Sequence, residues 1–243
     1  KFQHYTADSL VSDFGFKKLG GSKSHQAYWE KSVYETYKDA SLNQEWTKTL
    51  METCKKAEIS FFTSPYSIDL VDYVEPFVDA YKIGSGDITY TEIIEKISLK
   101  GKPVLIASGA SNIVEVKKAM DIILKNTSDV CLMQCNTNYE GLIENAEYQN
   151  INVIKSFYKL YPDIIMGLSC HMPKWTSVLG SVALGSRIIE KHFTDDRERI
   201  GPDHGFAINP SEWEEMVKET RLLESMLGDG NKRVEKNEEQ TAV

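Results

Sequence analysis

The sequence predicts an α/β fold in which parallel strands alternate with helices, the arrangement of a TIM (β/α)8 barrel. Short apolar runs recur along the chain, and a segment with the length and period of a helix lies in every gap between them. These runs are continuously apolar, as expected for parallel strands buried on both faces. A length of 243 residues suits one such domain. Only the end of an early strand is found at residues 1–3, so we expect the barrel to lack its first strand and most of its second.

The expected strands share a short apolar run that ends in polar residues. In chain order they are residues 1–3, 59–63, 80–85, 103–108, 130–135, 164–168 and 188–192. The expected helices share apolar residues at helical spacing. In chain order they are residues 42–57, 67–78, 89–99, 112–124, 151–161, 175–185 and 210–227.

Proline and glycine set several of these boundaries. Ser64-Pro65 is expected to stop the second strand, and Pro76 to end the next helix early, because proline cannot donate a helical hydrogen bond. Gly185 is expected to end a later helix, and Pro210 begins the last one within a plausible capping arrangement. Residues 4–34 are polar and interrupted by glycine, which predicts a long functional loop or a partly disordered segment.

Composition excludes several classes of protein. Lys and Arg number 28 against 36 Asp and Glu, a net charge of -8 with no basic block, so nucleic acid is not an expected partner. No apolar run approaches the length of a membrane span, and the start is not a signal peptide. The four cysteines lack the spacing of a metal site or a disulfide framework, so we expect buried thiols in a cytoplasmic protein.

Two histidines follow neighbouring strands of the predicted sheet. His171 ends the strand that begins at Ile164, and His192 ends the next strand. Since the carboxyl ends of parallel strands meet at one mouth of a barrel, the two imidazoles could share one metal ion. The alternative is that each histidine is a hydrogen-bonded structural residue.

Other polar residues follow the remaining strands at the same mouth. They are Lys1, Gln3, Thr63, Ser64, Lys82, Ser85, Asp87, Ser108, Gln134, Asn136, Thr137, Tyr139, Ser169, Lys191 and Thr194. Lysines and hydroxyls that converge in this way predict a site for a phosphate or a carboxylate, although any one Ser or Thr could instead cap a helix. Lys82 lies in an apolar strand, where an unpaired ammonium is unfavourable, so an anion is its expected partner.

Six ordered motifs carry a resemblance to a known family. They are Lys82-Ile83-Gly84-Ser85-Gly86-Asp87, Gly101-Lys102-Pro103, Gln134-Cys135 with Tyr139, Gly167-Leu168-Ser169 with His171, Glu190-Lys191-His192-Phe193-Thr194 and Gly201-Pro202-Asp203-His204. Together they resemble the N-acetylneuraminate (sialic acid) synthase family of nonulosonate synthases. The resemblance covers essentially the whole chain, and Lys1-Phe2-Gln3 is similar to the end of that family's second barrel strand.

The resemblance implies a TIM barrel that condenses phosphoenolpyruvate with an open-chain N-acetylated hexosamine, with the help of a divalent metal (Mn, Mg or Co). It implies that His171 and His192 are the metal ligands, and that Lys82 and Asp87 join them as catalytic residues, with Asp87 facing the sugar. The expected ligands of phosphoenolpyruvate, besides Lys82, are Lys1, Ser64, Ser85, Thr137 and Tyr139. Gln3, Ser108, Ser169 and Lys191 complete the expected substrate-binding set. A homodimer is also expected.

Two departures from the family pattern qualify this picture. Cys170 stands where the family usually has Asp, and Ala107 stands where a hydroxyl often lies. Residues 1–230 are expected to form the barrel, and residues 231–243 a linker toward a C-terminal antifreeze-like domain. Two other functions stay open, namely a keto-deoxy-sugar-phosphate synthase that takes a phosphorylated aldose and a non-catalytic barrel that binds a sugar or an anion.

Overall fold

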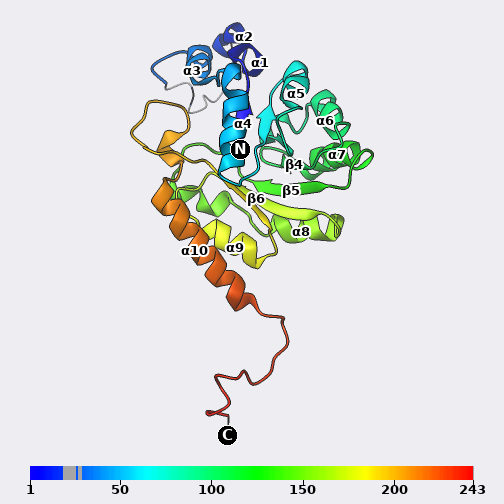
Figure 1. Cartoon of the computed structure of the whole chain (residues 1–243), viewed down its shortest axis with the longest axis vertical. Helices are drawn as coiled ribbons and strands as arrows, with labels where there is room; N and C mark the ends of the chain where they lie inside the picture. Colours follow the sequence, from blue (N-terminus) through cyan, green and yellow to red (C-terminus); the bar gives the residue numbers. More distant parts are fainter. Residues whose placement is uncertain (19–25, 27–28, 243) are drawn as a thin grey trace.

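The computed structural model describes residues 1–18, 26 and 29–242, and its centre is one parallel sheet (Figure 1). Seven strands pair in chain order within this part of the chain. Their bounds are β1 Phe2–His4, β2 Thr63–Pro65, β3 Tyr81–Ile83, β4 Val104–Ala107, β5 Val130–Cys135, β6 Ile165–Cys170 and β7 Ile188–Lys191. Every strand pairs with its successor in the parallel sense, as in a β/α barrel.

Helices connect the strands and cover the outer face of the sheet (Figure 1). The α-helices are α1 Ala7–Leu10, α2 Asp13–Lys18, α3 Val33–Ala40, α4 Thr47–Lys56, α5 Ile68–Val74, α6 Thr91–Ser98, α7 Ile113–Leu124, α8 Val153–Leu160, α9 Thr176–Ala183 and α10 Pro210–Leu227. The short 3-10 helices are η2 Gln44–Trp46, η3 Ser85–Asp87, η4 Ile143–Tyr148 and η5 His204–Phe206. A helix lies between each pair of successive strands, which confirms the predicted alternation of strands and helices.

The sheet curls, and its two faces are different. The main core lies between the outer face and the helices, and it includes Ile106 and Leu132. A smaller apolar cluster lies inside the curl and includes Leu105 and Met133, the neighbours of those residues in sequence. This alternation is the period of two that any strand imposes.

The two edge strands also approach each other across the inside of the curl. Lys1, next to β1, places its Nζ 3.5 Å from Oε1 of Glu190 in β7. No backbone pairing joins β1 to β7 among the described residues. The side chains that meet there form the candidate site.

The structure corrects two expectations about local elements. The second strand includes Ser64-Pro65, which we had expected to stop it. Pro65 is tolerated because the β2–β3 register pairs only Thr63 with Tyr81, so the missing N–H of Pro65 breaks no ladder bond. The expected irregular segment 4–34 instead contains α1 and α2, whereas positions 19–25, 27 and 28 lie outside the described residues.

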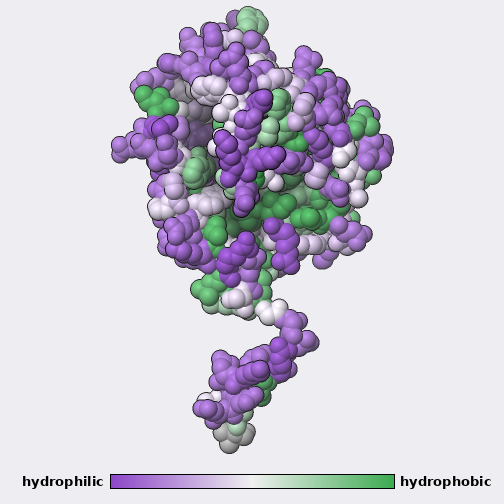
Figure 2. All heavy atoms as spheres, in the orientation of Figure 1, coloured by the Kyte–Doolittle hydropathy of each residue, from purple (hydrophilic) through white to green (hydrophobic). Residues whose placement is uncertain are grey.

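Past α10, residues 229–242 contain neither helix nor strand and extend away from the rest of the chain as a mostly hydrophilic segment (Figures 1 and 2). Figure 2 also shows hydrophilic residues over most of the visible face, with hydrophobic residues gathered in its central hollow. Across the described residues, no helix combines the length and the apolar character that a membrane crossing requires.

Candidate active site

A carboxylate between two lysines lies inside the curled sheet. Glu190 of β7 places Oε1 3.5 Å from Nζ of Lys1 and Oε2 3.6 Å from Nζ of Lys82 in β3. The hydroxyl of Ser169 in β6 donates a hydrogen bond to Glu190 Oε1 at 3.1 Å. The curl therefore gathers side chains that are far apart in the sequence.

Burial and the neighbouring charges shift the pKa of Glu190 in opposite directions. Burial alone would raise the pKa of Glu190, but Lys82 and Lys1 outweigh it and lower that pKa to about 2. Lys82 is only 2% exposed, and burial of its ammonium lowers its pKa, whereas Glu190 opposes that shift. The cationic end of Lys82 is thus held by one carboxylate and by the carbonyl of Ile83 at 3.1 Å.

Hydroxyl groups and a backbone amide lie on the neighbouring strand ends. The buried hydroxyl of Ser64 has no hydrogen-bond partner in the described structure, so it can still bind a ligand. Ser85 Oγ accepts a hydrogen bond from the amide of Gly109 at 3.0 Å. A Cβ on Gly109 would lie 1.7 Å from Thr137 Oγ1 and 2.8 Å from Ser85 Oγ, so this close cradle requires glycine.

The two predicted histidines do meet. The ring centroids of His171 and His192 are 5.1 Å apart. His171 Nδ1 lies 2.9 Å from the carbonyl of Asn136 and must be protonated to donate to it, which leaves Nε2 available. His192 Nδ1 lies 3.3 Å from a carboxylate oxygen of Asp203, and the same arrangement leaves its Nε2 available.

This pair fits a divalent metal ion. An imidazole nitrogen binds such an ion at about 2.1 Å, so two rings that share one have centroids within roughly 6.5 Å of each other. Each Nδ1 is held by an oxygen atom, a common way to orient a ligating imidazole. No group of three or more His, Cys, Asp or Glu side chains suited to a metal occurs in the described residues, so water or substrate would supply the remaining ligands.

Aromatic rings and a thiol surround the histidines. The Tyr139 ring lies 4.4 Å from the His171 ring between centroids, and Phe206 lies 4.9 Å from His192. Cys135 Sγ lies 3.8 Å from His171 Nδ1. The histidines therefore lie against an apolar wall that limits where a ligand can approach them.

The mouth above the lysines is polar. Gln3 Nε2 donates to the hydroxyl of Tyr66 at 2.8 Å. Asp87 follows β3, and burial raises the pKa of its carboxyl to about 6, although Lys82 opposes the shift. A cavity of about 1090 Å³ opens between β1 and β7, and Gln3, Glu190, His192 and Asp203 are among the residues that line it. Its volume is sufficient for two small substrates.

Two predicted substrate-binding residues direct their side-chain hydrogen bonds away from this group. Ser108 donates its hydroxyl hydrogen bond to the carbonyl of Met133 at 3.0 Å, on the side of the sheet away from Ala107. Lys191 places its Nζ 2.6 Å from the carbonyl of Met172, outside the curl. Both are one residue out of phase with the inward positions, because neighbouring side chains in a strand point to opposite faces.

Sequence reasoning missed four members of the group. They are Glu190, Asp203, Cys135 and Gly109. Glu190 could have been found from its spacing, since it lies two residues before His192 and must face the same side. Cys135 ends its strand and points inward, whereas Asp203 and Gly109 lie in loops whose paths the sequence does not reveal.

Comparisons with known proteins identify relatives that match nearly the whole chain. An uncharacterised protein of Methanocaldococcus jannaschii is 34% identical over 234 residues, which cover 96% of this chain and 64% of that protein. The N-acetylneuraminate-9-phosphate synthase of Mus musculus is 30% identical over 235 residues, which cover 96% of this chain and 64% of that enzyme. This chain thus spans less than two thirds of the length of either relative.

A solved structure and a family model complete the comparison. The N-acetylneuraminic acid synthetase of Leptospira borgpetersenii serovar Hardjo-bovis, solved with citrate, has a TM-score of 0.83 at 26% identity and covers 99% of this chain and 78% of that one. The model of the NeuB family matches residues 1–232. The motifs had indicated the same kinship, and the chain belongs to the NeuB family.

Proposed function

We propose that this chain forms the barrel of a synthase that condenses phosphoenolpyruvate with an open-chain N-acetylated amino sugar. The products would be a nine-carbon 2-keto-3-deoxy sugar acid and phosphate. One observation carries the proposal: Lys1 and Lys82 face a single carboxylate inside the curled sheet, beside the pair of His171 and His192. The family relationship and the names of its relatives support it.

The cationic and hydroxyl groups suit phosphoenolpyruvate, which carries a carboxylate and a phosphate. Lys1 and Lys82 would each bind an anionic group, and the unpartnered hydroxyl of Ser64 would donate to the same ligand. The cradle at Gly109 would hold phosphate oxygens through the hydroxyls of Ser85 and Thr137, with the Gly109 amide fixing Ser85 Oγ. The lysines would also offset the repulsion between the two anionic groups.

The reaction joins two carbon atoms and releases phosphate. C3 of phosphoenolpyruvate attacks the aldehyde carbon of the sugar, positive charge develops at C2, water adds there, and phosphate leaves the tetrahedral intermediate. The lysines hold the donor in place, so both reactants meet in one orientation. A divalent ion held by His171 and His192 would polarise the aldehyde oxygen as a Lewis acid. Tyr139 and Phe206 cover the histidines and would exclude water from their side.

The polar mouth suits the hydroxyl-rich end of a sugar. Gln3 keeps its carboxamide oxygen free of hydrogen bonds among the described residues, while Tyr66 holds its amide nitrogen. Asp87, with its pKa raised to about 6, would be partly protonated near neutral pH and could donate or accept a hydrogen bond from a hydroxyl. The mouse relative, named for a 9-phosphate product, favours a second candidate in which the sugar carries a phosphate.

Release of phosphate tests the proposal. The full-length protein is incubated with phosphoenolpyruvate and Mn2+, alone and with N-acetylmannosamine, its 6-phosphate, or arabinose 5-phosphate. We expect release only with an N-acetylated sugar, and Lys82→Met should abolish it at limiting phosphoenolpyruvate. Release with arabinose 5-phosphate alone would favour the synthase of a non-acetylated sugar acid. Binding of the ligands without any release would identify a non-catalytic barrel.

A further inference from the structure

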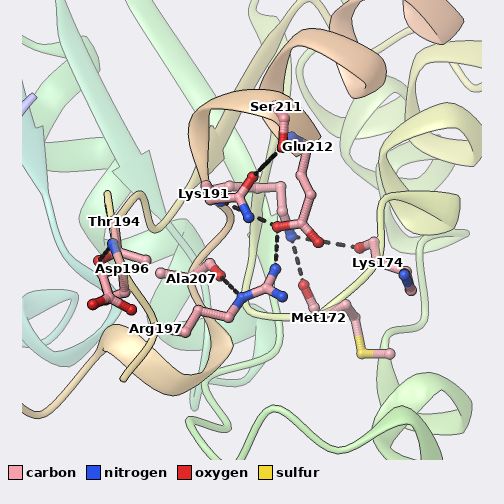
Figure 3. A network of polar contacts seen from close by, with 10 residues as sticks. Met172, Lys174, Lys191, Thr194, Asp196, Arg197, Ala207, Ser211 and Glu212 are labelled. Atoms are coloured by element: carbon pink, nitrogen blue, oxygen red, sulfur yellow. Dashed lines mark hydrogen bonds and ion pairs between the residues drawn. The ribbon is translucent and has the colours of Figure 1, made fainter. Parts of the chain in front are cut away.

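The buried ammonium of Lys191 has an unusual set of partners. Lys191 is only 7% exposed, and it lies between Glu190 and His192 in β7 but points out of the curl. Its Nζ donates to the carbonyl of Met172 at 2.6 Å and lies 3.5 Å from the carbonyl of Lys174 (Figure 3). The same Nζ lies 3.5 Å from Cys170 Sγ. All three acceptors are uncharged, and all belong to one short segment.

The obvious carboxylate near Lys191 is already engaged. Glu212, at the start of α10, pairs with the guanidinium of Arg197 and accepts a hydrogen bond from the amide of Asn209 at 3.1 Å (Figure 3). Arg197 also donates to the carbonyl of Ala207 at 2.8 Å. The ammonium of Lys191 is therefore held by backbone carbonyls and not by a carboxylate. An apolar residue at this buried position would not require the desolvation of a charge.

The residues that Lys191 contacts lie on both sides of His171 in the sequence. The ladder between β6 and β7 ends at the pair of Cys170 and Lys191, so His171 is the first residue beyond it. Pro173 has no N–H to donate, and no other hydrogen bond to the carbonyls of Met172 and Lys174 is found among the described residues. Beyond the last backbone pair, the side chain of Lys191 therefore supplies the hydrogen bonds to these carbonyls.

We propose that Lys191 is a positioning residue that holds the backbone of residues 172–174 and thereby keeps the His171 imidazole facing His192. Two consecutive residues then act on the site: His192 faces inward, and Lys191 fixes the segment next to His171. The importance of this role for activity rests on the proposed function of the two histidines as metal ligands. The positioning itself does not.

Three variants separate positioning from bulk stability. Lys191→Met keeps the length of the side chain but removes its charge and donors, and Lys191→Arg keeps both. Cys170→Ala is the matched control, because it leaves the bond to Met172 and removes only the weak acceptor at 3.5 Å and the 3.2 Å contact of Cys170 Sγ with Ser177 Oγ. Mn2+ affinity is measured by calorimetry, with His171→Ala as the reference without the ligand. Amide hydrogen exchange is followed over residues 171–175, and phosphoenolpyruvate binding reports on the lysines inside the curl.

We expect Lys191→Met to weaken Mn2+ binding by about 10- to 100-fold, the usual effect of losing a group that orients a ligating histidine. Exchange at residues 171–175 should become faster, while phosphoenolpyruvate affinity should stay within about twofold. Lys191→Arg should recover most of the Mn2+ affinity, and Cys170→Ala should match the wild type. If Lys191→Met does not fold, Lys191→Gln, which removes the charge but keeps an NH2 donor group, is measured in its place.

Two results would overturn the inference. Unchanged exchange at residues 171–175 in the methionine variant would show that Lys191 does not hold this segment. An equal loss of Mn2+ and phosphoenolpyruvate affinity would show a general structural role. If instead the wild type binds no Mn2+ while the exchange behaves as expected, the proposed metal role fails and the positioning role of Lys191 stands.

Discussion

Replacing Glu190 with glutamine should destabilise the fold and make its stability respond to added anions. The substitution leaves the ammonium groups of Lys1 and Lys82 without the carboxylate that now lies 3.5 and 3.6 Å from them. Removal of one partner from a buried ion pair costs about 3–5 kcal/mol. Both distances exceed those of direct charged hydrogen bonds, and the Lys1 side chain is 21% exposed, so we expect a loss of about 2–3 kcal/mol.

An anion that binds between the free lysines should restore much of this loss. Phosphate at twenty times its dissociation constant would stabilise the folded variant by about 1.8 kcal/mol. Urea denaturation with and without phosphate measures both effects.

Asp72→Asn is the matched control, since Asp72 also bridges two lysines, Lys96 at 2.8 Å and Lys100 at 2.7 Å, but on the exposed surface. Its stability should change little and should not respond to phosphate more than the wild type does. The reasoning is refuted if Glu190→Gln unfolds at the wild-type urea concentration, or if phosphate stabilises the variant and the wild type equally.

Three further predictions follow from buried contacts. Lys82→Met should weaken phosphoenolpyruvate binding by roughly 10- to 150-fold, the value of a lost charge-assisted hydrogen bond, while sugar binding stays within about twofold; calorimetry that finds equal losses for both ligands would contradict an anion-binding role. Burial lowers the pKa of His4 from 6.5 to about 4. Between these two pH values the folded state therefore binds fewer protons than the unfolded state. Stability should therefore fall by about 3 kcal/mol as the pH drops from 7 to 4, and urea denaturation of His4→Leu should show a smaller pH slope than the wild type. Gly109→Ala should cost about 1–3 kcal/mol in thermal stability, because the new Cβ would lie 1.7 Å from Thr137 Oγ1; an unchanged melting temperature would show that the cradle is loose.

The fold was largely predictable because local signals agree with its global pattern. Strand β5 has the predicted bounds Val130–Cys135, since it is apolar throughout and buried throughout. Helix α10 also has its predicted bounds, because Asn209 and Glu212 form a capping box and Pro210 takes the first turn, where no N–H is needed. The second strand was misplaced because sequence alone does not show which of its N–H groups meets a partner.

The site was predictable only as far as side-chain direction could be inferred. The two histidines were predicted because they follow apolar strands, and Lys82 was predicted because it is a charged residue within one. The motif that contains Lys191 gives no side-chain direction, whereas a period of two from His192 places the Glu190 side chain inside the curl and the Lys191 side chain outside it. Asp203 reaches His192 from a loop, and no spacing rule predicts such a contact.

Product mass after incubation with carbon-labelled phosphoenolpyruvate tests the central claim most directly. The full-length protein receives fully carbon-13-labelled phosphoenolpyruvate, Mn2+ and unlabelled N-acetylmannosamine or its 6-phosphate. The account predicts a sugar acid that contains all three labelled carbons joined to the intact N-acetylated sugar, formed together with one equivalent of phosphate. Labelled pyruvate as the sole product, with the sugar unchanged, would contradict it.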